Sequence, residues 1–354
     1  MKIDKVRKKI KNYNLDAFLF NYQPNVFYLT GFKSSNAFVL LTKDKKYFFT
    51  DGRYITSARE KLKDWDVILL KDGIRELKEV LTSIEGKIGF EKDRTTIDFY
   101  EKLIKKTDLD KKLMGFSGFL NDIRAIKTEE EIKIIKKAVH KTDEIFKYIV
   151  DNIGSFETEL DVRREIINQI FKKGGTGESF PAIVASGKNS AIPHYETSNK
   201  KIKKNQPLLI DMGMIYKGYC SDFTRTIFIG KVNKKLKEIY EIVKEAHLEA
   251  TEKVMEGITT KELDETARNV IKKYGYGDYF IHSLGHGIGI EIHEYPRISP
   301  KNYEILKEGM VFTIEPGIYI EGLGGVRLEN VVVCRKENAE VLTKTPLDMI
   351  KINI

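Results

Sequence analysis

The fold is decided by the segment LLIDMGMIYKGYCSDFTRT, residues 208–226. Three apolar residues lead into Asp211, the pair Lys217-Gly218 marks a turn, and Asp222 lies on the return. Because side chains alternate between the two faces of a strand, we expect Asp211 and Asp222 on one face, directly or diagonally across a hairpin. Two buried carboxylates this close repel each other, so the hairpin needs a shared proton, an arginine or a cation.

A second hairpin is predicted in TIEPGIYIEGLGGVRLEN, residues 313–330. Glu315 and Glu329 fall near each other across a turn in the glycine-rich stretch between them. Arg327 stands two residues before Glu329 and therefore shares its face of the strand. One interpretation left open is that Arg327 simply neutralises both glutamates in a buried ion-pair network.

The segment SLGHGIG, residues 283–289, sets His286 among glycines, where backbone and metal can approach it closely. Hard carboxylate ligands with one imidazole favour Mn, Co or Fe, and they also permit Zn. Such a site can hold two divalent cations about 3.5–4 Å apart and acidify the water between them. We therefore expect metal-assisted hydrolysis at a site formed by Asp211, Asp222, His286, Glu315 and Glu329.

A degenerate internal repeat surrounds these segments. Two Glu-Leu-Asp triplets, 159–161 and 262–264, each begin a predicted helix, and Gly-x-Gly pairs follow at 175–177 and 275–277. His194 and His293 come next, 99 residues apart. Each half begins with a long predicted helix and ends in a strand pair. The shared order predicts two related halves about a pseudo-twofold axis, and chance similarity of short motifs is the alternative.

The first 120 or so residues alternate between short apolar runs and helical patterns, which is typical of a small α/β domain. The predicted strands cover residues 15–20, 37–42, 47–50, 65–70 and 87–90, and the helices cover 53–63 and 74–84. A long amphipathic helix then begins at Thr128 with a capping box. The predicted domains are residues 1–122 and 123–354.

Composition narrows the class of protein. The chain has 354 residues, of which 41% are hydrophobic and 32% charged, as in an ordinary globular protein. No apolar run is long enough to span a membrane, the basic N-terminus lacks a signal core, and Cys220 and Cys334 suit a reducing cytoplasm. The net charge of +9 comes from lysines scattered among glutamates. This pattern favours a solvated surface over nucleic-acid binding.

The five residues of the predicted site resemble the dimetal ligand set of the pita-bread metallopeptidases, which include methionine aminopeptidase, aminopeptidase P and prolidase. The N-terminal segments 15–19, 25–31 and 49–54 resemble the creatinase/prolidase N-terminal domain. The matching motifs of the second domain are Asp-x-Gly at 211–213, Ser-Asp-x-Thr-Arg-Thr at 221–226, Gly-His-Gly-Ile-Gly at 285–289, His-Glu-x-Pro at 293–296, Thr-Ile-Glu-Pro-Gly at 313–317 and Gly-Val-Arg-Leu-Glu-Asn at 325–330.

The resemblance implies a fold class and a set of metal ligands. The fold would be α+β, an N-terminal α/β domain followed by a pita-bread domain with an internal pseudo-twofold repeat. Asp211 and Asp222 would bind one divalent metal ion, with Asp222 also reaching the second. His286 and Glu315 would bind the second ion, and Glu329 would bridge the two. Mn or Co is expected, and Zn or Fe is acceptable.

The resemblance also implies roles for residues outside the ligand set. His194 and His293 would bind the substrate carbonyl and stabilise the developing oxyanion. Glu315 would also accept a proton from the attacking water. Arg297 could meet a substrate carboxylate or could be a surface arginine, and Phe180 could line the prolyl pocket or belong to the core.

The predicted function is hydrolysis of the bond between an N-terminal residue and proline by an Xaa-Pro dipeptidase. An aminopeptidase P acting on longer peptides is the alternative. Methionine aminopeptidase leaves the N-terminal domain unexplained, and creatinase works without the metal that five intact ligands imply. A non-catalytic pita-bread binding protein is the remaining alternative. The expected partners are proline-containing di- or oligopeptides and a second copy of the chain in a homodimer, with no nucleic acid and no membrane.

Overall fold

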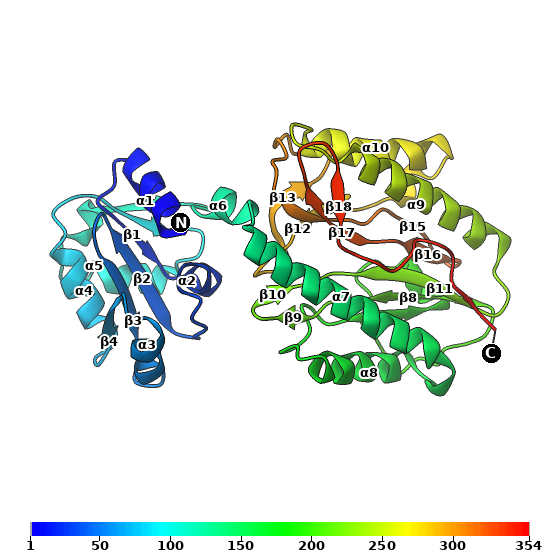
Figure 1. Ribbon diagram of the computed structural model, residues 1–354, viewed down its shortest axis with the longest axis horizontal. Helices are drawn as coiled ribbons and strands as arrows, with labels where there is room; N and C mark the ends of the chain where they lie inside the picture. Colours follow the sequence, from blue (N-terminus) through cyan, green and yellow to red (C-terminus); the bar gives the residue numbers. More distant parts are fainter. Residues whose placement is uncertain (1, 354) are drawn as a thin grey trace. The chain divides into compact units, whose positions relative to one another are not determined.

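The computed structural model describes residues 2–353 as a chain of two compact units, Met1–Arg124 and Ala125–Ile354. Met1 and Ile354, the outer ends of the two predicted domains, lie outside the described residues. The division falls in the short helix α6 (Asn121–Ala125). Figure 1 shows the course of the chain through both units.

The first unit is built on a six-stranded mixed sheet in the order β4-β3-β2-β1-β5-β6. Strand β1 pairs antiparallel with β2 and parallel with β5. The strands are β1 (Ala17–Phe20), β2 (Ala37–Thr42), β3 (Lys46–Thr50), β4 (Asp66–Leu69), β5 (Ile88–Glu91) and β6 (Leu113–Phe116). The helices are α1 (Lys2–Asn12), α2 (Gln23–Thr30), α3 (Ile55–Lys61), α4 (Arg75–Thr82) and α5 (Ile97–Ile104), with a 3₁₀ turn η1 (Leu109–Lys111).

The α/β organisation predicted for this unit is confirmed. All five predicted strands and both predicted helices form, each with ends within two residues of the expected ones. The pattern missed α1, α2, α5 and β6. Strand β6 was missed because it lies at the sheet edge, where its end residues are half-buried and its two middle residues are exposed, so that it has no apolar period of two.

The second unit consists of two halves, each with a helix pair followed by a hairpin. The helices are α7 (Glu129–Asp151), α8 (Glu159–Lys172), α9 (Lys234–Lys253) and α10 (Thr260–Lys273), with 3₁₀ turns η2 (Ile153–Ser155), η3 (Gly187–Ala191) and η4 (Gly277–Tyr279). In Figure 1 the four α-helices frame the strands of this unit. None of the helices formed by residues 2–353 combines the length and apolarity needed to cross a lipid bilayer.

The strands of the second unit form two larger sheets, in the orders β19-β11-β8-β7 and β13-β12-β14-β17-β18, and two small ribbons, β9–β10 and β15–β16. Those of the first half are β7 (Ile183–Ser186), β8 (Gln206–Asp211), β9 (Ile215–Tyr216), β10 (Tyr219–Cys220) and β11 (Thr224–Ile229). The later ones are β12 (Gly285–Gly287), β13 (Glu294–Ile298), β14 (Val311–Ile314), β15 (Gly317–Ile320), β16 (Gly324–Arg327), β17 (Asn330–Cys334), β18 (Ala339–Val341) and β19 (Lys351–Ile352).

The predicted repeat is visible in the helix starts. Thr158 caps α8 and Thr259 caps α10, each in a full capping box, and each helix has 14 residues. The caps are therefore equivalent at a spacing of 101 residues. The two Glu-Leu-Asp triplets, spaced by 103, are consequently out of register, because the capping box places Asp161 and Glu262 at the same third helical position.

Each half has its own hydrophobic core. Helices α7 and α8 pack on β8 and β11 through Phe146, Ile166 and Ile210, among others. Helices α9 and α10 pack on β14 and β17 through a separate cluster that includes Val243 and Phe312.

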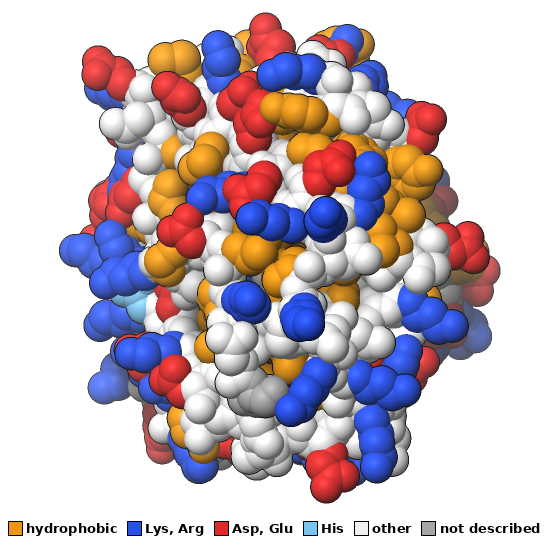
Figure 2. Space-filling view, turned by 90° about the vertical axis from the view of Figure 1, so that its right-hand side faces the viewer, with side chains coloured by type: hydrophobic (Ala, Val, Ile, Leu, Met, Phe, Trp, Pro, Cys, Tyr) orange, Lys and Arg blue, Asp and Glu red, His pale blue; other side chains and the backbone are white. Residues whose placement is uncertain are grey.

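Figure 2 shows one face of the molecule, on which Lys and Arg are interspersed with Asp and Glu. This mixture is typical of a solvated face.

Candidate functional site

The first carboxylate pair lies where β8 and β11 separate. Asp211 ends β8 and pairs with Thr224, and the Met212 amide donates to the Phe223 carbonyl at 2.9 Å. This register continues into the ribbon β9–β10, where Ile215 pairs with Cys220. Asp222 thus lies two positions along from the partner of Asp211, which is the diagonal placement that strand alternation allowed.

The turn of this hairpin has the geometry expected from its sequence. Tyr216 pairs with Tyr219, which leaves Lys217 and Gly218 as the two turn residues. Both have positive φ, 50° and 82°. Two successive residues with positive φ define the type I′ turn that matches strand twist in tight hairpins. The predicted turn at Lys217-Gly218 is confirmed.

The second carboxylate pair lies at the same point of the second hairpin. Ile314 pairs with Asn330, and Gly317 pairs with Arg327 beyond a short break in the ladder. Glu315 is therefore directly opposite Glu329. Thr313 Oγ1 donates to Glu315 Oε1 at 3.0 Å, and Thr224 Oγ1 donates to Glu329 Oε2 at 2.5 Å. The second of these bonds joins the two hairpins.

His286 is the middle residue of β12, between β13 and β14. A Cβ atom on Gly285 would lie 1.9 Å from the Thr313 carbonyl oxygen, so this position accepts only glycine. The contact of His286 Nδ1 with the Gly287 carbonyl at 3.1 Å assigns the ring proton to Nδ1. His286 Nε2 then faces Asp222 Oδ2 at 3.5 Å and Glu315 Oε1 at 3.4 Å.

The site carries more negative charge than its own cations offset. Burial, followed by repulsion from neighbouring carboxylates, raises the pKa of Asp222 and Glu329 well above the usual range. Burial also raises the pKa of Glu315 to about 7. Arg327 forms its direct ion pair with Asp211, Nη2 to Oδ2 at 2.5 Å. The network in which Arg327 pairs directly with Glu315 and Glu329 does not form.

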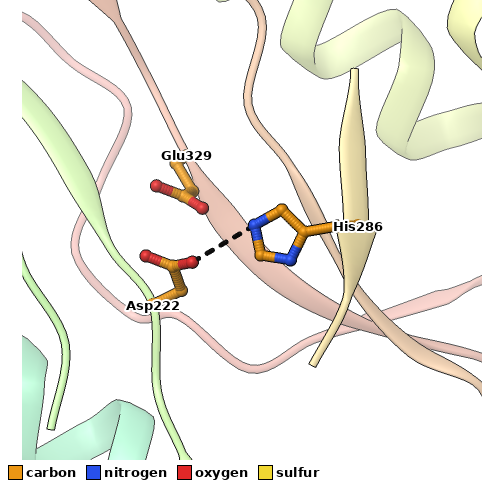
Figure 3. Close-up of side chains that lie close together, drawn as sticks. All are labelled: Asp222, His286 and Glu329. Carbon is orange, nitrogen blue, oxygen red and sulfur yellow. Dashed lines mark ion pairs between the residues drawn. The ribbon is translucent and has the colours of Figure 1, made fainter. Parts of the chain in front are cut away.

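The donor atoms of this cluster suit divalent cations. Asp211 Oδ1 and Glu329 Oε1 are buried and have no hydrogen-bond partner among residues 2–353. Burial lowers the pKa of His286, which leaves Nε2 as a neutral lone-pair donor. Ligand atoms of Asp222, His286 and Glu329 lie within 4.8 Å of one another (Figure 3). Unpaired buried oxygens and an imidazole nitrogen at this spacing fit metal coordination.

A cavity of about 920 Å³ opens on the carboxylate cluster. The nine residues that the sequence singled out for the site all line it: Phe180, His194, Asp211, Asp222, His286, His293, Arg297, Glu315 and Glu329. The structure thus brings them together, and their individual roles stay predictions.

The two histidines outside the cluster differ in their surroundings. The His293 ring packs edge-on against His286, with centroids 4.3 Å apart. Partial burial, with His286 nearby, lowers the pKa of His293 to about 4, so this ring is neutral at pH 7. His194 lies in a segment without regular secondary structure, and both histidines are exposed.

Three arginines line the cavity, and two of them already have a carboxylate partner. Arg163 binds Glu178 with both Nε and Nη2, at 3.3 and 3.1 Å. Arg327 binds Asp211, as described above. Arg297 donates from Nε to Ser283 Oγ at 3.1 Å and forms no ion pair within the part of the chain that the structure describes.

Sequence reasoning missed a chain of side chains behind Asp211. His282 Nδ1 faces the Ser283 carbonyl at 2.8 Å, so His282 Nε2 accepts a hydrogen bond from the Tyr319 hydroxyl at 2.9 Å. That hydroxyl accepts from Arg327 Nη1 at 2.9 Å. The available signal was strand parity, since Tyr319 stands four residues after Glu315 and so on its face.

The sequence matches two protein-family models and an Xaa-Pro dipeptidase over nearly its whole length. Residues 133–336 match the sequence model of metallopeptidase family M24, and residues 2–126 match the creatinase/prolidase N-terminal domain. An Xaa-Pro dipeptidase of Pyrococcus horikoshii is 38% identical over 352 residues, which cover 99% of this chain and 98% of the relative.

Solved structures of two enzymes share the fold over their whole length. An Xaa-Pro dipeptidase from Bacillus anthracis superposes with a TM-score of 0.93 at 37% identity, covering 99% of both chains. An X-Pro aminopeptidase from Thermotoga maritima superposes with a TM-score of 0.89 at 34% identity, covering 98% of this chain and 100% of the other. The predicted fold class, an N-terminal α/β domain followed by a pita-bread domain, is confirmed.

Proposed function

Because this chain belongs to metallopeptidase family M24, we propose that it is an Xaa-Pro dipeptidase, which hydrolyses the bond between an N-terminal residue and proline. Family membership makes the chain a metal-dependent hydrolase. The similarity to Xaa-Pro dipeptidases covers both units and supports the substrate class.

We propose that the carboxylate cluster holds two divalent metal ions, Mn or Co in preference to Zn or Fe. Asp211 and Asp222 would bind the first ion, His286 and Glu315 the second, and Glu329 would be shared. The buried oxygens without hydrogen-bond partners support this assignment. When bound, such ions supply Lewis-acid polarisation and a water nucleophile at neutral pH.

The remaining steps fall to the side chains that line the cavity. Glu315 would take up the proton of the attacking water at its carboxylate. His194 and His293 would donate hydrogen bonds to the carbonyl oxygen as its charge develops. The neutral state of His293 leaves one ring N–H available for this purpose. Phe180, on the wall of the cavity, would contact the proline ring.

A single observation carries the preference for dipeptides: Arg297 lines the cavity without a carboxylate partner among residues 2–353, whereas Arg163 and Arg327 have theirs. The C-terminal carboxylate of an Xaa-Pro dipeptide would supply that partner. A longer substrate has a neutral amide at this place. An unpaired guanidinium therefore favours the dipeptide, because a charge-assisted bond is stronger than one to an amide.

The proposal is tested by comparing Met-Pro, Met-Pro-amide and Met-Pro-Gly as substrates of the Mn- or Co-loaded protein. We expect the highest kcat/KM for Met-Pro, with the loss for the amide appearing mainly in KM. The alternative is an aminopeptidase of the kind found in Thermotoga maritima, which shares the fold. Faster turnover of Met-Pro-Gly than of Met-Pro would select it. Absence of turnover with all three substrates would contradict both.

We further propose that the protein acts in the cytoplasm as a homodimer. The two cysteines are buried and unpaired, as expected for a reducing compartment. The creatinase/prolidase type of N-terminal domain supports dimer formation by the resemblance described above. Light scattering coupled to gel filtration would give twice the mass of 40.8 kDa for a dimer. A monomeric mass at micromolar concentration would contradict it.

A further inference from the structure

Glu159, the first residue of α8, is a fully buried carboxylate that holds the segment carrying His194. Its Oε1 and Oε2 accept from five donors, all in residues 186–198. The donors are Ser186 N at 2.7 Å, Asn189 Nδ2 at 3.2 Å, Tyr195 Oη at 2.9 Å, Ser198 N at 3.4 Å and Ser198 Oγ at 3.1 Å. We propose that Glu159 is a positioning residue for His194.

Other bonds hold the part of the segment after the histidine: Thr197 Oγ1 accepts from the Val184 amide and donates to the Ala182 carbonyl, both at 2.9 Å, and the Leu160 amide donates to the Ser198 carbonyl at 3.1 Å. Residues 192–200 form neither helix nor strand, and His194 is exposed. No hydrogen bond to the His194 ring occurs within residues 2–353, so its place depends on the residues beside it. Two donors to Glu159 precede His194, and Tyr195 and Ser198 follow it. The carboxylate therefore fixes the chain on both sides of the histidine.

The same segment is also attached to the second hairpin. Ser190 Oγ accepts the Gly325 amide of β16 at 2.9 Å and itself donates to the Gly187 carbonyl at 2.6 Å. Strand β16 ends at Arg327, which binds Asp211. Through Glu159 and Ser190 the segment is thus held between a helix of the first half and the hairpin that carries Glu329.

The second half contains a comparable arrangement. Asp264 of α10 is fully buried, accepts the Leu284 amide at 2.9 Å and pairs with Arg268 at 2.7 Å. Arg268 in turn donates to the carbonyls of Phe280 and His282, at 2.8 and 2.9 Å. Helices α8 and α10, which both begin with a capping box, therefore each hold, through a buried carboxylate, the segment that leads to a histidine of the site.

Glu159 and Asp264 differ in how the negative charge of the buried carboxylate is balanced. Asp264 has the guanidinium of Arg268, whereas Glu159 forms no ion pair among the described residues and relies on amides and hydroxyls alone. A carboxylate that accepts five hydrogen bonds can be matched by no neutral side chain of the same size, since an amide replaces one acceptor oxygen with a donor. The hydrogen bonds that hold residues 186–198 are accordingly sensitive to one isosteric change, Glu159→Gln.

The inference rests on the proposed function, in which His194 binds the substrate carbonyl. A misplacement of about 1 Å in a group that contacts the reacting atoms can cost on the order of 100-fold in rate. In Glu159→Gln we expect kcat for Met-Pro to fall by about 10- to 100-fold with unchanged metal content. Hydrogen exchange of the amides in residues 186–198 should accelerate.

Asp161→Asn is the matched control. Asp161 lies in the same first turn of α8, where its Oδ2 accepts from Thr158 N at 3.0 Å in the capping box. It has no hydrogen bond to the segment that carries His194. We expect Asp161→Asn to keep kcat and the exchange of residues 186–198, although it removes the same charge from the same helix terminus.

A double-mutant cycle with His194→Ala separates positioning from general loss of structure. If Glu159 acts through His194, Glu159→Gln should cost less than about 3-fold once His194 is already alanine. An additive loss would overturn the inference. If Glu159→Gln does not fold, Ser198→Ala replaces it in the cycle, since this variant removes one of the five donors. Ser198→Ala must then show the same non-additivity with His194→Ala at smaller amplitude. Additive losses would equally overturn the inference.

Failure of the proposed function gives a different result. A wild-type rate for His194→Ala would remove His194 from the reaction and overturn the catalytic part of the inference together with that role. A slow His194→Ala with an additive cycle would leave the proposed function standing and overturn only the positioning role of Glu159. Unchanged amide hydrogen exchange of residues 186–198 in Glu159→Gln would show that the Glu159 carboxylate does not hold the segment.

Discussion

Glu315 lies directly opposite Glu329 across the second hairpin, in the short break between the pairs Ile314–Asn330 and Gly317–Arg327. Two buried carboxylates at this spacing repel each other, and both also repel a third carboxylate on Asp222. The hairpin keeps them together because the ladder on each side fixes the register. Folding therefore sustains a charge cluster that a bound cation would relieve.

Replacing Glu329 by glutamine should separate stability from activity. The variant Glu329→Gln removes one repelling charge, so the metal-free protein should unfold at the same temperature as the wild type or higher. Hydrolysis of Met-Pro should fall by more than about 100-fold, since even the partners of metal ligands cost 10- to 100-fold. Calorimetry of the chelated protein checks the expected unfolding temperature, and a rate assay with measured metal content checks the expected loss of activity. A wild-type rate at full metal content would contradict the dimetal mechanism.

Removal of metal should inactivate the wild type reversibly. A chelator followed by dialysis is expected to abolish turnover, and Mn or Co should restore it. Ion binding to the folded state should also raise the unfolding temperature, because a ligand at 100 times its Kd adds about 2.7 kcal/mol of stability. Thermal scans with and without Mn test this. Undiminished turnover in the chelated, metal-analysed protein would be incompatible with the proposal.

His194 and His293 should affect turnover without affecting metal content. Alanine at either position is expected to lower kcat by about 10²- to 10³-fold, the usual cost of losing a donor to a developing oxyanion. Metal analysis of each variant is the check on the assignment. Loss of a metal ion from His293→Ala would instead identify His293 as a metal ligand. The His293 ring lies close enough to the cluster for such a role, since it contacts the His286 ring.

Arg297 should set the preference for substrate length. In Arg297→Ala we expect KM for Met-Pro to rise by about 10-fold or more, since a hydrogen bond between charged groups is worth about 1.5–3 kcal/mol. Turnover of Met-Pro-Gly should change little. Ser283→Ala, which removes the hydroxyl that Arg297 Nε binds, should show a smaller effect of the same sign. Unchanged hydrolysis of both substrates by Arg297→Ala would move the enzyme to the aminopeptidase P class.

The cysteines should be unreactive in the native protein. Burial raises the pKa of both Cys220 and Cys334 to about 12. With a pKa of about 12, almost none of either thiol is in the reactive thiolate form at pH 8. Iodoacetamide at pH 8 should leave the native chain unmodified and should add two groups after denaturation. Mass spectrometry distinguishes these outcomes, and rapid native alkylation would contradict the burial of the thiols.

Much of the fold was predictable because its signals are local. Thr128 is the N-cap of α7, in the capping box that the sequence indicated, and the strand predicted at residues 37–42 is β2 with the same bounds. The turn at Lys217-Gly218 was marked by Gly218, since glycine adopts positive φ without a steric cost. Helices α2 and α5 were missed because neither presents a one-sided apolar pattern: α2 buries the neighbouring pairs Asn25-Val26 and Tyr28-Leu29, and α5 buries only Leu103.

The sequence by itself placed Asp211 with Asp222 and Glu315 with Glu329, because strand parity and turn chemistry fix the face and the register of a hairpin. The other residues of the site followed from their motifs and from the family resemblance. Tertiary structure alone decided what each charge faces. Arg327 shares a strand face with Glu329, yet its guanidinium pairs with Asp211 from the other half of the domain. Glu159 is the first residue of α8 and binds residues 186–198, which no sequence periodicity connects to it. Such contacts depend on how the two halves pack, and hydrophobic burial, which drives that packing, is not directional.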